Sequence, residues 1–177
     1  MLAPHRLDAQ LMDFRFVAID MYGGPAWPAD SEVGVAFGGR LGFADLFGRT
    51  VQMGLQLDWW AAGREFGDLE VRDAVGGLDF WADLAHPRTV RPYLGLGAAL
   101  HSIDTSRKDG SPIEDGESLE AARLDGLKVG ASGYAGLTLR LTGTGAIWLV
   151  AEYRYNIVSD ISYQQLRAGL RLAGSGP

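Results

Sequence analysis

The chain has 177 residues, a net charge of −6, 25 glycines and no cysteine. This length suits a single domain, the lack of cysteine excludes a disulfide framework, and the acidic balance argues against nucleic-acid binding. No apolar run approaches the roughly 20 residues of a membrane helix, so bulk hydropathy identifies no membrane segment. A membrane barrel escapes that criterion, because half of its strand residues face a polar lumen.

Period-two alternation of apolar and polar residues predicts strands, because successive side chains of a strand point to opposite faces. The first two predicted strands are Phe16–Tyr22 and Val33–Phe43. Between them lies G-G-P-A-W-P-A-D, which we expect to break the sheet. The third, Thr50–Trp60, shows the alternation most clearly, with large apolar side chains on one face and polar or small ones on the other.

The fourth predicted strand, Leu69–Leu84, changes phase halfway, and a bulge near Gly76 and Gly77 would restore its parity. The fifth, Val90–Ile103, alternates leucine with glycine and is followed by a long polar segment, residues 104–123. The last three predicted strands are Leu127–Leu141, Ala146–Val158 and Tyr163–Leu172.

Eight strands joined by hairpins predict an all-β fold, an eight-stranded antiparallel up-and-down transmembrane β-barrel. We expect an N-terminal extension over residues 1–15, a single barrel domain over 16–172 and a tail over 173–177. The links after the second, fourth and sixth strands are short, and the link after the fifth is long. Outer-membrane barrels have this asymmetry, with short periplasmic turns and longer outer loops.

The polar row indicates which face points inward. Its acidic and basic residues nearly cancel, as an enclosed lumen requires, because a buried unpaired charge costs several kcal/mol. Glycines on this row leave room for Trp60, Trp81, Tyr93, Tyr134 and Trp148. The predicted polar lumen network consists of Asp20, Arg40, Gln52, Gln56, Asp58, Asp79, Asp83, His101, Lys128, Arg140, Glu152, Arg154, Arg167 and Arg171.

The apolar row carries almost no charge and ends in aromatic residues, as the interfacial girdles of membrane barrels do. We therefore predict that this row faces lipid. The predicted lipid-facing residues are Val51, Met53, Leu55, Leu57, Trp59, Leu94, Leu96, Leu137, Leu139, Leu149, Tyr153 and Tyr155.

Three short segments resemble a known family: R-P-Y-L-G-L-G-A-A-L from Arg91, A-E-Y-R-Y-N from Ala151 and A-G-L-R-L from Ala168. Together they resemble the eight-stranded opacity-protein and OmpA-type transmembrane domain, although the last strand ends on Leu172 rather than on an aromatic residue. The resemblance implies a bacterial outer-membrane protein whose signal peptide has been removed. It also implies a structural or surface-interacting role.

The partners that this resemblance implies are outer-membrane lipid, lipopolysaccharide and the barrel-assembly machinery. An extracellular partner would bind through the loop at residues 104–123. An eight-stranded barrel is just wide enough for its own side chains, so we expect no wide pore. Two alternative functions involve no catalysis. The protein could be a narrow conduit for small or hydrophobic solutes, or a soluble lipocalin-like carrier.

A lipid-A-modifying enzyme is a further alternative, because His101, Ser102 and Asp104 supply the residue types of such a site. Adjacent residues of a strand point to opposite faces, so His101 and Ser102 cannot form a simple nucleophile–base pair. We therefore predict no catalytic residues. The acidic residues Asp109, Glu114, Asp115 and Glu117 lack the spacing of an EF-hand loop, and we predict no metal and no cofactor.

Overall fold

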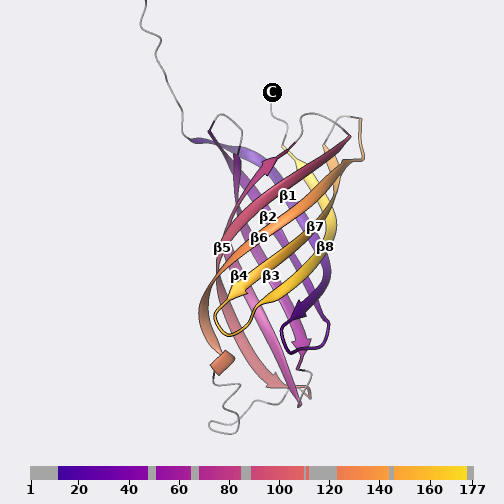
Figure 1. Ribbon diagram of the computed structural model, residues 1–177. Coiled ribbons are helices and arrows are strands. Elements are labelled where there is room, and N and C mark those ends of the chain that lie inside the picture. The colour runs from indigo at the N-terminus through magenta and orange to yellow at the C-terminus, as the bar shows by residue number, and fades with distance from the viewer. Residues whose placement is uncertain are drawn as a thin grey trace, which may run out of the picture.

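The computed structural model describes residues 12–47, 51–64, 68–84, 89–109, 111, 123–143 and 146–174. In these residues eight strands pair antiparallel in chain order, and the last pairs with the first to close a barrel (Figure 1). The predicted fold class is thereby confirmed. The strands are β1 (Met12–Pro28), β2 (Gly34–Leu46), β3 (Val51–Gly63), β4 (Leu69–Asp83), β5 (Val90–Arg107), β6 (Gly126–Arg140), β7 (Ile147–Val158) and β8 (Tyr163–Ala173).

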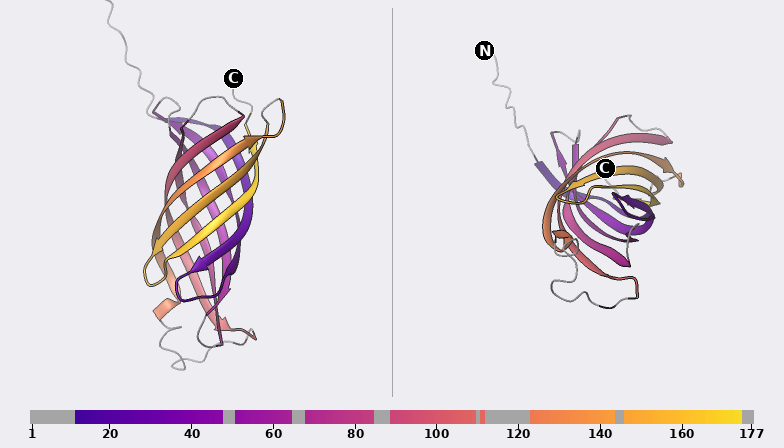
Figure 2. Two further views of the ribbon diagram at one scale, coloured as in Figure 1. Left: turned by 45° about the vertical axis from the view of Figure 1, so that its right-hand side comes forward. Right: turned by 60° about the horizontal axis from the view of Figure 1, so that its bottom comes forward.

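The two ends of the barrel differ in their connections (Figure 2). The β1–β2, β3–β4, β5–β6 and β7–β8 connections lie at one end, which we call the loop end. The β2–β3, β4–β5 and β6–β7 connections lie at the other, together with the start of β1 and the end of β8, and we call it the short-turn end. None of the described residues belongs to a helix long and apolar enough to cross a bilayer.

β1 is much longer than predicted. It begins at Met12, inside the predicted extension, and runs through G-G-P-A-W-P to Pro28, so the expected break at this segment is wrong. Pairing with β2 continues through Pro25, opposite Val35, whereas pairing with β8 stops at Gly23 and resumes at Ala26. Proline has no N–H to donate, and β1 accommodates it by interrupting the ladder on one side only.

β4 keeps one register along its whole length, so the predicted bulge near Gly76 and Gly77 is wrong. Val71 and Val75 point into the barrel on the same parity as Asp79. The change of phase in the sequence reflects a change of environment, because Val71 joins an apolar cluster at the loop end, while Asp73 on the same row stays polar. The register shifts lie instead in β1, between Phe14 and Ala18, and in β2, between Gly42 and Ala44.

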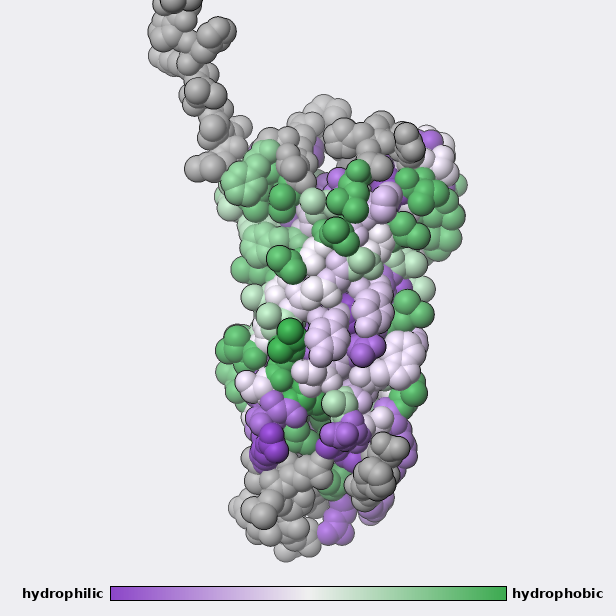
Figure 3. All heavy atoms as spheres, in the orientation of Figure 1, coloured by the Kyte–Doolittle hydropathy of each residue, from purple (hydrophilic) through white to green (hydrophobic). Residues whose placement is uncertain are grey.

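The hydrophobic side chains outside the barrel are exposed, and the polar ones inside are buried. Leu57 is 70% exposed and Leu96 is 69% exposed, whereas Arg154 is completely buried. Figure 3 shows hydrophobic and weakly polar side chains over most of the visible wall, with strongly hydrophilic ones gathered near the loop end. This arrangement is the reverse of a soluble carrier and excludes the lipocalin-like alternative.

Most of the predicted lipid-facing residues are exposed on the outer wall. Val51 and Trp59 are half-buried there, and Trp59 packs against Phe37 with ring centroids 5.0 Å apart. Met53 lies on the same face of β3 as Leu55 but is only 9% exposed, because it packs with Ala44 and Leu46. The residues exposed as predicted are Leu55, Leu57, Leu94, Leu96, Leu137, Leu139, Leu149, Tyr153 and Tyr155.

Candidate functional site

The centre of the lumen is a network of ion pairs that joins strands from all around the barrel. Arg40 on β2 donates through Nε and Nη2 to Asp20 Oδ2 on β1, at 3.0 and 2.7 Å. Its Nη1 reaches Asp79 on β4 at 3.2 Å and Glu152 on β7 at 3.3 Å. One guanidinium therefore contacts carboxylates on three other strands, a use for which the planar donor fork of arginine is well suited.

Arg154 on β7 forms the second node of this network. It donates to Asp79 Oδ1 at 3.0 Å, to Glu152 Oε1 at 3.0 Å and to Ser132 Oγ at 3.2 Å. It also donates to Gln56 on β3. Asp79 and Glu152 each contact both Arg40 and Arg154, so the two arginines share their counter-charges.

The network extends in both directions along the lumen. Arg171 donates through Nε to Asp20 Oδ1 at 2.7 Å. Arg167 donates to Asp58, which also accepts a 3.0 Å bond from the Tyr22 hydroxyl. Four carboxylates thus meet four guanidiniums, none more than 7% exposed: Asp20, Asp58, Asp79 and Glu152 with Arg40, Arg154, Arg167 and Arg171. This balance is the condition under which buried charge is tolerated.

Aromatic side chains fill the space between the charges. The guanidinium of Arg40 lies 4.5 Å from the Trp81 ring, and that of Arg154 lies 4.1 Å from the Tyr134 ring. Two of these rings occupy space left by glycine. Tyr134 is paired with Gly95 and Tyr93 with Gly136, and a Cβ at either glycine would collide with the facing ring. The crowded lumen therefore depends on glycine at these two positions.

Toward the loop end, His101 and Trp60 share one carboxylate. His101 Nδ1 lies 2.7 Å from Asp73 Oδ2, and Trp60 Nε1 donates to the same oxygen at 3.0 Å. Ser102 and Asp104 are exposed on the opposite face of β5. The constellation suggested by the sequence is therefore not assembled.

Asp73 is not among the predicted lumen residues, because it lies in the half of β4 whose alternation is out of phase. Counting back in steps of two from Asp79 would have placed it on the lumen row. Other lumen residues that were missed are Tyr22 and Gln165, together with an Arg15–Asp45 ion pair near the short-turn end.

Several predicted members of the network lie apart from it. Arg140 lies on the lumen-facing side of β6, opposite Trp148, but is exposed at the short-turn rim. Lys128 is at the loop-end rim, where it bonds Asp160. Gln52 and Asp83 are half-buried and take part in none of the ion pairs described above. Within the network, Asp58 pairs with Arg167, Glu152 with Arg154 and Asp79 with Arg40.

The interior has little free space beside this network. A hollow of about 140 Å³ between Tyr22, Asp58, Gln165 and Arg167 has no room for a water-sized sphere. Of the predicted acidic cluster, Asp109 accepts hydrogen bonds from Ser111, and Glu114, Asp115 and Glu117 lie outside the described residues. In the described part of the chain, no three His, Asp or Glu side chains are grouped as a metal ion would require.

No protein-family model matches this chain, and no curated protein sequence matches it significantly. Among solved structures, Neisserial surface protein A matches with a TM-score of 0.61 at 18% identity, over 92% of this chain and 99% of that one. The N-terminal β-barrel domain of Pseudomonas aeruginosa OprF matches with a TM-score of 0.56 at 15% identity, over 90% and 98%. The chain therefore has the fold of the eight-stranded outer-membrane β-barrels to which these two proteins belong.

Proposed function

We propose that this protein is an integral component of a bacterial outer membrane, with a structural or surface-interacting role and no wide pore. One observation carries the proposal: the charged residues are paired inside the barrel, while the hydrophobic residues are exposed around it. In water this arrangement would expose a large apolar surface, whereas in a bilayer the same surface faces hydrocarbon.

The filled lumen favours this role over that of a narrow conduit, because a solute would have to displace several paired guanidiniums at once. The side chain of His101 lies on the opposite face of β5 from those of Ser102 and Asp104. This likewise favours a structural or surface-interacting role over that of a lipid-modifying enzyme. Surface contacts would be made at the loop end, through the connections that include residues 104–123. Lipid, lipopolysaccharide and the barrel-assembly machinery remain the partners that we propose.

The experiment that tests this proposal places arginine on the outer wall at two depths. Leu55 is 49% exposed in the middle part of β3, and Leu127 is 73% exposed at the loop-end start of β6. Arginine on the lipid face costs about 2–4 kcal/mol at the bilayer midplane and about 0–1 kcal/mol near the interface. We expect Leu55→Arg to lower the free energy of unfolding in phospholipid vesicles by at least 2 kcal/mol more than Leu127→Arg does.

Denaturant titration of each variant in vesicles, followed by tryptophan fluorescence, measures this difference. Equal and small effects at the two depths would mean that Leu55 does not face hydrocarbon. A parent protein that stays monodisperse in buffer without detergent would reject the membrane assignment altogether.

A further inference from the structure

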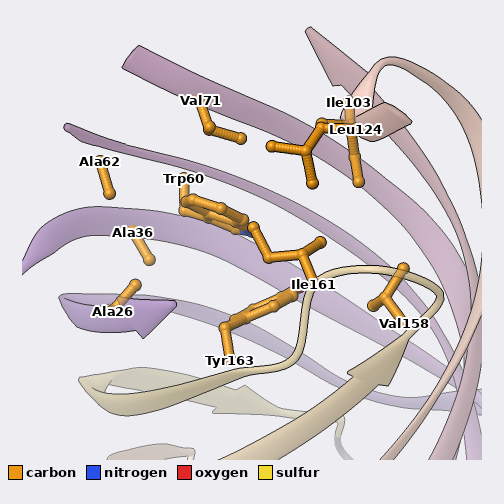
Figure 4. Close-up of a cluster of buried hydrophobic side chains, with 10 residues drawn as sticks. All are labelled: Ala26, Ala36, Trp60, Ala62, Val71, Ile103, Leu124, Val158, Ile161 and Tyr163. Atoms are coloured by element: carbon orange, nitrogen blue, oxygen red, sulfur yellow. The ribbon is translucent and has the colours of Figure 1, made fainter. Parts of the chain in front are cut away.

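The loop end of the lumen is closed by an apolar cluster. It contains Trp60, Val71, Ile103 and Tyr163 from the strands, together with Leu124 and Ile161 from two connections (Figure 4). Leu124 precedes β6, and Ile161 lies between β7 and β8. The side chains of Leu124 and Ile161 are buried although both residues belong to connections between strands. Two separate loop-end segments therefore pack into the cluster.

A set of polar contacts ties these two segments together outside the cluster. Asp160, next to Ile161, accepts a 2.8 Å bond from Arg123 Nε through Oδ1 and a 2.9 Å bond from Lys128 Nζ through Oδ2. Lys128 also donates to the backbone oxygen of Arg123 at 2.8 Å. The bonds from Lys128 and then Arg123 hold the pKa of the Asp160 carboxyl below its ordinary value. We call Asp160, Lys128 and Arg123 the latch.

Several polar atoms beside the cluster have no hydrogen-bond partner among the described residues. They include Asp73 Oδ1, the Tyr163 hydroxyl and Asn156 Nδ2, all on side chains at most 3% exposed. The ring of His101 lies 6.1 Å from that of Tyr163, and Asp73 is paired with Trp60 of the cluster, so these groups lie together at the loop end. A buried polar group without a partner costs free energy, and water reaching these atoms would recover part of that cost.

We propose that Leu124 and Ile161 form a two-part lid over the loop end of the lumen, held shut by the latch, and that its opening admits water to the unpartnered polar atoms of Asp73 and Tyr163. Closing buries two aliphatic side chains and forms the latch, whereas opening hydrates the unpartnered polar atoms. Because these contributions oppose each other, the closed state is favoured by a small margin and the lid opens without disturbing the ion pairs deeper in the barrel.

The test uses a single thiol as a reporter, since the chain has no cysteine of its own. Val71→Cys places the thiol in the cluster, at a position that is completely buried. The barrel is reconstituted in phospholipid vesicles, and the rate of reaction with a charged methanethiosulfonate reagent is measured. We expect Asp160→Asn to raise this rate roughly fivefold, as loss of a partly exposed ion pair shifts the open population.

Two further variants keep the proposal falsifiable. Leu124→Ala shortens the lid while leaving the latch residues in place, and we expect it to raise the rate by about tenfold or more. Asp109→Asn is the matched control, because Asp109 is an exposed loop-end carboxylate whose bonds go to Ser111 rather than to the latch. It should leave the rate unchanged.

Assembly of each variant is verified first by its heat-dependent migration in detergent gels. Equal thiol-reaction rates for Asp160→Asn and Asp109→Asn would show that the latch does not hold the lid shut. If the Val71→Cys thiol in the otherwise unchanged chain reacts as fast as a freely exposed thiol, there is no lid. A slow and identical rate in every variant would show that the cluster does not open.

Discussion

At the scale of single residues, Arg154 is hydrogen-bonded to four other side chains of the lumen. It contacts Gln56, Asp79 and Ser132 on three other strands and Glu152 on its own. Replacing it with methionine would leave Asp79 and Glu152 short of counter-charge in a site that excludes water. Removing one partner of a buried ion pair typically destabilises a protein by about 3–5 kcal/mol.

We therefore expect Arg154→Met to lower the free energy of unfolding by about that amount, measured by denaturant titration in vesicles. Arg140→Met is the matched control, since the Arg140 side chain is exposed at the rim, and it should stay within about 0.5 kcal/mol of the parent. A small effect of Arg154→Met would mean that the network reorganises around the gap.

Which residues enter the lumen could mostly be predicted from the sequence, but not how they pair. Alternation assigns a face to each residue, and this placed Arg40, Asp79 and Glu152 correctly on the lumen side. It does not give the height of a residue along the barrel axis, which depends on strand tilt and on the stagger between strands. Asp58 consequently meets Arg167 on β8 rather than Arg40 on the neighbouring β2.

At the scale of the element, β6 offers a comparison between its two faces. Gly136 faces the lumen, where an added Cβ would collide with the Tyr93 ring and lie 2.7 Å from the carbonyl oxygen of Ala151. Gly133 faces outward, where the nearest atom to such a Cβ is a methyl group of Leu96 at 3.9 Å. We expect Gly136→Ala to destabilise the barrel by about 1–3 kcal/mol through overpacking.

Gly133→Ala should be neutral or stabilise by up to about 1 kcal/mol, because alanine restricts the unfolded chain without a clash in the fold. Thermal unfolding of both variants, followed by the loss of the compact band in detergent gels, measures the contrast. Equal changes in unfolding temperature for the Gly136→Ala and Gly133→Ala variants would show that the Tyr93 ring moves aside without a cost in free energy.

Two strands show where the alternation rule fails. In β4 the lumen row changes from Asp79 to Val75, Asp73 and Val71, and Val71 belongs to the apolar cluster at the loop end. The sequence pattern reports the polarity of each face, and here both faces change character as the strand approaches the loop end. In β1, glycine and proline suggested a break, yet pairing with β2 holds the strand together. The local sequence reveals neither the apolar cluster beside β4 nor the pairing of β1 with β2.

At the scale of the whole molecule, the filled lumen predicts how the barrel behaves as a channel. An eight-stranded barrel has an interior just wide enough for side chains, and here that interior holds a charge-balanced network. We expect the parent protein in planar bilayers to show no sustained conductance step of the size seen for water-filled porins. A stable open level that persists in Asp160→Asn and in the parent alike would contradict the filled lumen.

The bond between Arg171 and Asp20 joins residues 151 positions apart and lies on the seam between β8 and β1. Contacts of such long sequence separation form late and slowly, because a large loop of chain must first be closed. Until β8 arrives, β1 and β7 each present a full row of unpaired backbone groups, which is a template for joining another chain. The last strand of the barrel thus decides whether the sheet closes into a cylinder or stays an open ribbon prone to aggregation, so the arrival of β8 is a step at which assembly can fail.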